Sequence, residues 1–308
     1  MKSGKNFKIY GMTYGIVGDL IMGLPLLNYF EKKYPGSYKY WTIQKKIAFV
    51  APLYFNHPLI DKIEISSEWN HLGERDLEIA SQCDIYVGDI HNPKNQHPTR
   101  KDWWNEHPVM EYRVMRHGYN YRDVLTEEEM KPKLYKWFTP GFETRQSSYS
   151  KKYVNEVDNN FFSNVISIFP FAQASPGSRC PSANWWKEMV QKLMGAGYNV
   201  HHFGHPNEQV ILESPNYTCY TQLTFFDQIK LALASRLTIG TDSGSMWVIG
   251  AYQHPAIHLI TNWLPNHHTN FLSLAPVNDN CVNMFEKGGC DRISTEDVLN
   301  NVIKGAKI

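Results

Sequence analysis

The regular alternation of short apolar segments with longer amphipathic ones most constrains how this chain folds. Short runs rich in Val, Ile and Phe predict buried strands, and apolar residues at three- to four-residue intervals predict helices. Strands that alternate with helices are typical of a parallel sheet covered by helices, so the pattern predicts an α/β protein. The expected strands are Lys8–Met12, Tyr38–Ile43, Asp61–Ile65, Asp84–Val87, Val165–Phe169, Asn199–Phe203, Leu237–Gly240 and Ala256–Ile260, and the expected helices are Asp19–Tyr34, Ala183–Met194, Phe225–Ala234, Gly244–Tyr252 and Thr295–Lys304.

The length of the chain predicts two domains. A chain of 308 residues is long for one hydrophobic core, because domains of about 150 residues are usual. A polar segment with Gly and Pro, Thr139–Lys152, has the composition of a connection between domains. We therefore expect an amino-terminal Rossmann-like domain at 1–145 and a carboxyl-terminal one at 146–308.

Charge and cysteine usage narrow the classes of function. The chain has 31 Lys and Arg against 30 Asp and Glu, a net charge of +1, which argues against nucleic acid as a partner. The 5 cysteines are scattered and odd in number, as expected for reduced thiols in the cytoplasm. No window approaches 18 apolar residues, so we expect at most peripheral contact with a membrane.

Two glycine-bearing turns follow predicted strands. In the first, Gly15 and Gly18 allow a tight turn, and Asp19 stands at the start of a helix. Asp19 is either an N-cap residue or a residue of the active site. The spacing does not match the dinucleotide fingerprint of Rossmann oxidoreductases.

The second turn precedes the helix expected at Gly244–Tyr252. It contains Asp242, Ser243, Gly244 and Ser245, small or polar residues whose amides would be free at a helix start. The positive end of the helix dipole favours an anion there, and a diphosphate fits such a site. The alternative is a capped structural helix without a ligand.

Two further loops also follow strands and carry charged residues. The loop 171–181 contains Arg179, whose guanidinium would offset the charge of a departing nucleotide or would simply face solvent. The segment 203–208 ends at Glu208, which would accept hydrogen bonds from ribose hydroxyls or would favour the first turn of a helix.

Metal and sugar-stacking sites receive little support from the sequence. His201 and His202 are neighbours in a predicted strand, so alternation points them to opposite faces. The chain has no D-x-D pattern, and we expect no catalytic metal. Aromatic doublets at 103–104 and 185–186 suit sugar rings, but aromatic residues mostly form cores.

Six segments in order resemble the motifs of glycosyltransferase family 9, the lipopolysaccharide heptosyltransferase-like group, over nearly the whole chain. No single motif is decisive, but their order is specific. The matching segments are Gly18–Asp19 with Leu24–Leu27, Asn56–Ile63, Arg179–Pro181 with Trp185, Gly204–Glu208, Leu223–Gly240 leading to Asp242–Gly244, and Cys290 with Ile293 and Val298.

The resemblance implies a GT-B fold, with two Rossmann-like domains facing each other across a cleft, and a metal-independent inverting glycosyltransferase. It implies a nucleotide-diphosphate sugar as co-substrate, with a heptose as one candidate for the transferred sugar, and no other cofactor. The implied acceptor is a glycan or a lipid-linked molecule. Asp19 would be the general base, and Gly15 and Gly18 would line the acceptor side. Arg179, Glu208, Asp242, Ser243, Gly244 and Ser245 would bind the donor.

The sequence departs from the family at three positions. Trp247 replaces a histidine, Cys180 replaces a tryptophan, and Arg179 replaces a lysine. The alternatives are a catalytically silent nucleotide-sugar or glycan-binding protein on the same fold, and a nucleotide-sugar epimerase.

Overall fold

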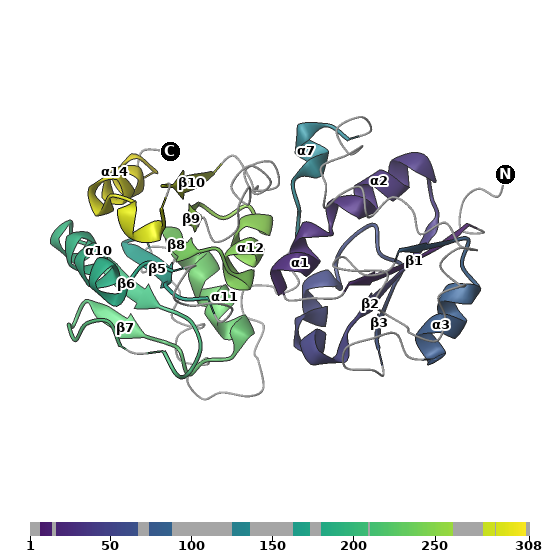
Figure 1. Cartoon of the computed structure of the whole chain (residues 1–308), viewed down its shortest axis with the longest axis horizontal. Helices are drawn as coiled ribbons and strands as arrows, with labels where there is room; N and C mark the ends of the chain where they lie inside the picture. Colours follow the sequence, from purple (N-terminus) through teal and green to yellow (C-terminus); the bar gives the residue numbers. More distant parts are fainter. Residues whose placement is uncertain are drawn as a thin grey trace. The chain divides into compact units, whose positions relative to one another are not determined.

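The computed structural model describes residues 7–13, 17–66, 74–87, 125–135, 163–172, 180–208, 210–260, 280–286 and 288–305. The chain divides into two compact units, Met1–Trp137 and Phe138–Ile308 (Figure 1). The expected connection at Thr139–Lys152 lies outside the described residues, so the domain boundary at residue 145 stays a prediction.

Among its described residues, the amino-terminal unit has a parallel sheet in the order β3-β2-β1-β4. Its strands are β1 (Lys8–Thr13), β2 (Tyr38–Ile43), β3 (Lys62–Ile65) and β4 (Ile85–Val87). All four strands predicted for this half are confirmed. β1 pairs with β2 along its whole length and with β4 on its other side, so it lies inside the sheet. The carboxyl end of β1 therefore points to the edge where ligands of such sheets bind.

The single helix expected at Asp19–Tyr34 is two helices in the structure, α1 (Val17–Met22) and α2 (Pro25–Lys33). The prediction was wrong because Pro25 has no amide hydrogen and favours the first position of a helix over its interior. As predicted, α2 ends just before Gly36, whose φ of 68° suits glycine. Three further elements were not predicted: the 3-10 helix η2 (Lys45–Tyr54), α3 (Glu74–Ser81) and α7 (Glu127–Met130).

The described part of the carboxyl-terminal unit has a second parallel sheet, in the order β10-β9-β8-β5-β6-β7. Four of its strands were predicted within one residue: β5 (Val165–Phe169), β6 (Asn199–His202), β8 (Leu237–Thr241) and β9 (Ala256–Ile260). The two edge strands, β7 (Tyr217–Cys219) and β10 (Cys281–Phe285), were missed. Only Tyr217 is fully buried in these two strands, so neither has the run of buried residues that marks a central strand.

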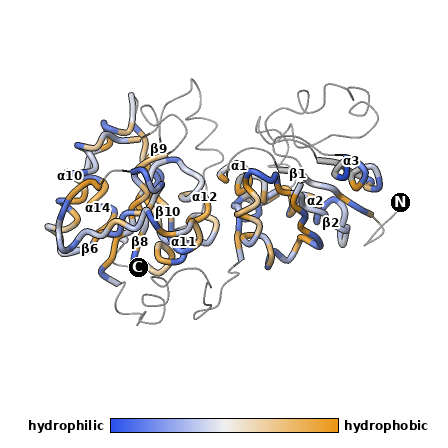
Figure 2. The backbone as a smooth tube through the Cα atoms, turned by 90° about the horizontal axis from the view of Figure 1, so that it is seen from below, coloured by the Kyte–Doolittle hydropathy of each residue, from blue (hydrophilic) through white to orange (hydrophobic). Residues whose placement is uncertain are grey.

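Helices cover both faces of this sheet (Figure 1). On one face, α10 (Ala183–Gly195) and α14 (Thr295–Gly305) pack with Ile166 of β5 and Ile239 of β8 in one hydrophobic core. The other face carries α11 (Phe225–Ala234) and α12 (Gly244–Ala251). Residues 246–251 of α12 are all buried, and Figure 2 shows this helix in the orange of hydrophobic residues. A helix that is apolar all round belongs in a core.

The tryptophan doublet of α10 belongs to the core and is not a sugar-binding surface. Trp185 is 7% exposed and Trp186 0%. The indole N–H of Trp185 donates to the Ile293 carbonyl at 2.7 Å, and that of Trp186 donates to the Pro170 carbonyl at 3.1 Å. Both indoles are therefore satisfied inside the protein. The other doublet, at 103–104, lies outside the described residues.

Two findings concern the environment of the chain. Within the described segments, no helix combines the length and apolarity needed to cross a bilayer. The cysteines Cys83, Cys180, Cys219, Cys281 and Cys290 are free thiols. The cytoplasmic location stays a prediction.

Burial of His258 in β9 predicts a loss of stability in mild acid. This side chain is 2% exposed, and burial lowers its pKa to about 4. A histidine of the unfolded chain titrates near 6.5. Between these values only the unfolded state takes up the proton, so each pH unit lowers the free energy of unfolding by about 1.4 kcal/mol.

We therefore expect the free energy of unfolding, measured with urea, to fall more steeply between pH 6.5 and 4.5 in the wild type than in His258→Leu. The other buried histidines are the same in both proteins, so the difference in slope belongs to His258. Equal slopes would contradict a histidine held neutral at this position.

Candidate functional site

The carboxyl ends of β5, β6 and β8 bring the predicted donor-binding segments to one edge of the sheet. The strand order places β5 between β8 and β6. The loops after these strands contain Arg179, Glu208 and the turn Asp242–Ser245. Because the strands are parallel, all three loops leave from the same edge, where open α/β sheets bind ligands.

The turn from β8 into α12 presents backbone amides at this edge. Ser243 is the N-cap residue, and its hydroxyl accepts a hydrogen bond from the Met246 amide at 3.4 Å. Gly244 and Ser245 follow in the first turn, and their amides donate to none of the described residues. The first turn has no acidic residue. Two free amides at the positive end of a helix dipole form an anion site.

The close approach of α12 to β8 depends on Gly240. A Cβ at this position would lie 2.6 Å from Sδ of Met246 and 2.9 Å from the carbonyl oxygen of Phe169. The oxygen belongs to the backbone of β5 and has little freedom to move. Glycine at the end of β8 therefore fixes where the amides of α12 lie.

Asp242 points into the protein rather than toward a ligand. Its side chain is buried, and Oδ1 accepts a hydrogen bond from the indole N–H of Trp247 at 3.1 Å. Trp247 is itself 2% exposed. Trp247 thus holds the turn from inside. Because a carboxylate would repel a diphosphate, Asp242 shapes the turn, and the amides of its neighbours suit the anion.

The loop after β5 returns to the end of β8. Sγ of Cys180 accepts a hydrogen bond from the Ala172 amide at 3.1 Å and lies 3.9 Å from the Thr241 hydroxyl oxygen. Cys180 therefore holds both ends of this loop together. Arg179 lies outside the described residues, but its neighbour in the sequence is placed beside the β8–α12 turn.

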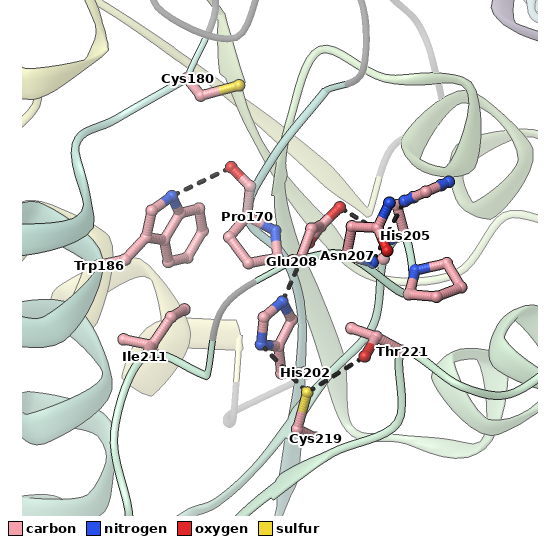
Figure 3. A network of polar contacts seen from close by, with 12 residues as sticks. Pro170, Cys180, Trp186, His202, His205, Asn207, Glu208, Ile211, Cys219 and Thr221 are labelled. Carbon is pink, nitrogen blue, oxygen red and sulfur yellow. Dashed lines mark hydrogen bonds and ion pairs between the residues drawn. The ribbon is translucent and has the colours of Figure 1, made fainter.

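Glu208 lies in the turn after β6 (Figure 3). No helix begins between this turn and α11 in the part of the chain that the structure describes, so the first-turn alternative for Glu208 is wrong. The carboxylate accepts from the His205 amide at 2.8 Å and contacts Nε2 of His202 at 3.1 Å. Its side chain is 13% exposed. Glu208 is thus held at the edge of the sheet by two hydrogen bonds.

A buried polar network behind Glu208 was not predicted from the sequence. His202 is 0% exposed, and its Nδ1 lies 2.6 Å from the Tyr217 hydroxyl. The same nitrogen lies 3.8 Å from Sγ of Cys219 (Figure 3). Only the register of β6 with β7, which pairs His202 with Cys219, brings these side chains together. Since β7 was missed, no sequence signal linked them.

The charges of this network are coupled. Burial alone would lower the pKa of His202, but hydrogen bonds with Cys219 and Glu208 outweigh it and raise that pKa. Burial raises the pKa of the Cys219 thiol, whereas hydrogen bonds with His202 and Thr221 lower it, with a result of about 7. His201 stacks edge-on against Tyr220 instead, which confirms that neighbouring histidines face opposite sides.

Two of the three residues predicted in the amino-terminal unit, Gly18 and Asp19, lie in α1. Gly15 falls outside the described residues, and Gly18 is buried within α1. Asp19 occupies the third position of α1, so the alternative of an N-cap aspartate is wrong. The direction of the Asp19 side chain is not described, and its role as general base stays a prediction.

The described residues offer no metal site. In these segments no group of three His, Cys, Asp or Glu side chains has the arrangement of a metal site. Metal independence therefore stays a prediction.

Solved structures show the same fold over nearly the full chain. The chain is similar to E. coli ADP-heptose lipopolysaccharide heptosyltransferase II, with a TM-score of 0.68, 16% identity, and coverage of 98% of this chain and 99% of that one. The chain is also similar to a glycosyl transferase of family 9 from Veillonella parvula, with a TM-score of 0.65 and 15% identity. The match covers 100% of this chain and 99% of that one. A third similar structure is E. coli heptosyltransferase WaaC with ADP-2-deoxy-2-fluoro heptose, with a TM-score of 0.57 and 11% identity. The match covers 97% of this chain and 99% of that one.

These similarities confirm the predicted fold class, the two Rossmann-like domains of GT-B glycosyltransferases. No protein-family model and no curated protein sequence matches the chain.

Proposed function

We propose that this chain is a metal-independent, inverting glycosyltransferase of the heptosyltransferase-like family. Its donor is a nucleotide-diphosphate sugar, and its acceptor is a hydroxyl of a glycan or lipid-linked glycan, as in lipopolysaccharide synthesis. The free cysteines support a reducing compartment such as the cytoplasm.

One observation carries this proposal: the amides of Gly244 and Ser245 at the start of α12, at the carboxyl edge of the sheet, donate to none of the described residues. The fold adds support, because the WaaC structure of the same fold contains ADP-2-deoxy-2-fluoro heptose. A nucleoside diphosphate has the charge that these amides and the helix dipole favour.

The proposed reaction needs one base and one anion site. Asp19 takes the proton of the acceptor hydroxyl as its oxygen attacks the anomeric carbon. The bond between this carbon and the diphosphate oxygen breaks on the opposite face, which inverts the configuration. The nucleoside diphosphate leaves with the bonding electrons. The amides of Gly244 and Ser245, with Arg179, stabilise its growing charge in the place of a metal ion.

The first test is a thermal-shift screen of ADP-, GDP-, UDP- and dTDP-sugars. We expect one nucleotide to stabilise the protein clearly, since a ligand at 100 times its Kd adds about 2.7 kcal/mol to the free energy of unfolding. No shift with any of the four would contradict a donor site.

Product analysis then separates the alternatives. Transfer requires both a donor and an acceptor. An epimerase would change the donor without an acceptor, and a silent binding protein would leave both unchanged. The expected result is a glycosylated acceptor and free nucleoside diphosphate in equal amounts.

A further inference from the structure

The directions of the hydrogen bonds that link Glu208, His202 and Tyr217 follow from which atoms can donate and which can only accept. A carboxylate only accepts hydrogen bonds, so the proton between His202 and Glu208 sits on Nε2 of the imidazole. When the ring is neutral, Nδ1 is an acceptor, and the Tyr217 hydroxyl, which at 2.6 Å is closer than Sγ of Cys219 at 3.8 Å, donates to it. The Tyr217 oxygen in turn accepts from the Ile211 amide at 3.2 Å. Each link fixes the direction of the next.

The turn that carries Glu208 is held from a second side by α11. The Gln228 side chain accepts a hydrogen bond from the Gly204 amide and donates one to the Gly204 carbonyl, both at 2.9 Å. A Cβ at Gly204 would lie 2.1 Å from Oε2 of Glu208. The carboxylate therefore packs against Gly204, whose backbone is hydrogen-bonded to Gln228. Its position is set by this glycine and by the hydrogen bond with His202.

Glu208 nevertheless keeps acceptor capacity. Its two carboxylate oxygens offer about four lone-pair sites, and the described contacts use one from His202 and one from the His205 amide. Two sites remain for a ligand at the edge of the sheet. A fixed carboxylate with free lone pairs matches a vicinal diol, such as the two hydroxyls of a ribose, because each hydroxyl donates one hydrogen bond.

We propose that His202 is a positioning residue for nucleotide recognition: its Nε2–H holds the Glu208 carboxylate in the orientation that receives the ribose hydroxyls, and Tyr217 fixes the ring from behind. This proposal rests on the proposed function, since it takes the ligand to be a nucleoside diphosphate. It assigns a role to a fully buried histidine that touches no substrate.

The test compares the Kd values of ADP and 2′,3′-dideoxy-ADP by calorimetry. The two ligands differ only in the ribose hydroxyls, so their ratio isolates the contact with Glu208 from the contact of the diphosphate. We expect the wild type to prefer ADP by about tenfold, the effect of one or two hydrogen bonds to a charged group. In His202→Leu the preference should fall to about one, with the Kd of the dideoxy ligand within about twofold of wild type.

Three further variants distinguish positioning from general damage. His202→Gln keeps a donor near the position of Nε2 and should restore most of the preference. Gly204→Ala should lose it, because the added Cβ displaces the carboxylate while His202 remains. In a Glu208→Ala background the His202→Leu change should alter the ratio no further, because the two residues act through one contact.

The outcomes separate this inference from the proposed function. If the wild type binds neither ligand, the nucleotide site itself is wrong. If it binds both and His202→Leu keeps the tenfold preference, or weakens both ligands equally, His202 does not position Glu208. If His202→Leu does not fold, Tyr217→Phe and Gly204→Ala decide the matter, because retention of the preference in both would overturn the proposal.

Discussion

Replacing Asp19 by Asn is expected to slow glycosyl transfer by about 10²- to 10⁴-fold while the Kd of the donor stays within about twofold of wild type. A general base contributes about this much to a rate, and an amide cannot accept the proton of the acceptor hydroxyl. Asn has nearly the same size as Asp, and position 19 lies inside α1, where the backbone is already helical. The measurement is the initial rate of transfer to a hydroxyl acceptor that the product analysis has identified, together with donor binding by calorimetry.

The matched control is Glu74→Gln, which neutralises an exposed carboxylate at the start of α3 in the same unit. It should leave both the rate and the donor affinity unchanged. Wild-type turnover in Asp19→Asn would show that another group takes the proton. A parallel loss of donor binding would show that Asp19 acts on the donor instead.

Replacing Ser245 by Asp is expected to weaken nucleoside diphosphate binding by about 100-fold or more without loss of thermal stability. The new carboxylate would stand in the first turn of α12, which now has no acidic residue. It would interact favourably with the helix dipole, a contribution of about 0.3–1 kcal/mol. The same charge would oppose a diphosphate, and two unit charges 4 Å apart repel by about 4 kcal/mol near a protein surface.

Ser245→Asp should keep or gain stability while it loses affinity for the nucleoside diphosphate. A misfolded variant would lose both, so the two measurements together tell the cases apart. Ser245→Asn provides the control, since Asn has the shape of Asp without its charge. We expect Ser245→Asn to keep the affinity within a few fold. Equal binding by the two variants would place the diphosphate away from α12.

The fold was largely predictable because most of its strands are short runs of mostly apolar residues, which can be recognised in the sequence. Val165–Phe169 and Ala256–Ile260 are apolar except for Ser167 and His258, and all their residues are buried, as expected of central parallel strands. The edge strands β7 and β10 lack this signal, since only one of their eight residues is fully buried, and both were missed. The break at Pro25 was missed because the apolar pattern continues through Leu24, Leu26 and Leu27, and periodicity alone does not show where a helix restarts.

The candidate site was predictable only where it follows a strand directly. Ser243, Gly244 and Ser245 come straight after β8, so their place at the sheet edge follows from the sequence. The inward direction of Asp242 does not, because it depends on a hydrogen bond to Trp247 one turn later. The partners of Glu208 depend on register: Tyr217 and His202 lie 15 residues apart and meet only because β7 pairs with β6.

The central claim is that the first turn of α12 binds the diphosphate of the donor, and a crystal structure with the nucleoside diphosphate selected by the thermal-shift screen tests it most directly. We expect phosphate oxygens about 2.7–3.2 Å from the amide nitrogens of Gly244 and Ser245. A nucleotide bound with its phosphates elsewhere, and only water at these two amides, would contradict the claim.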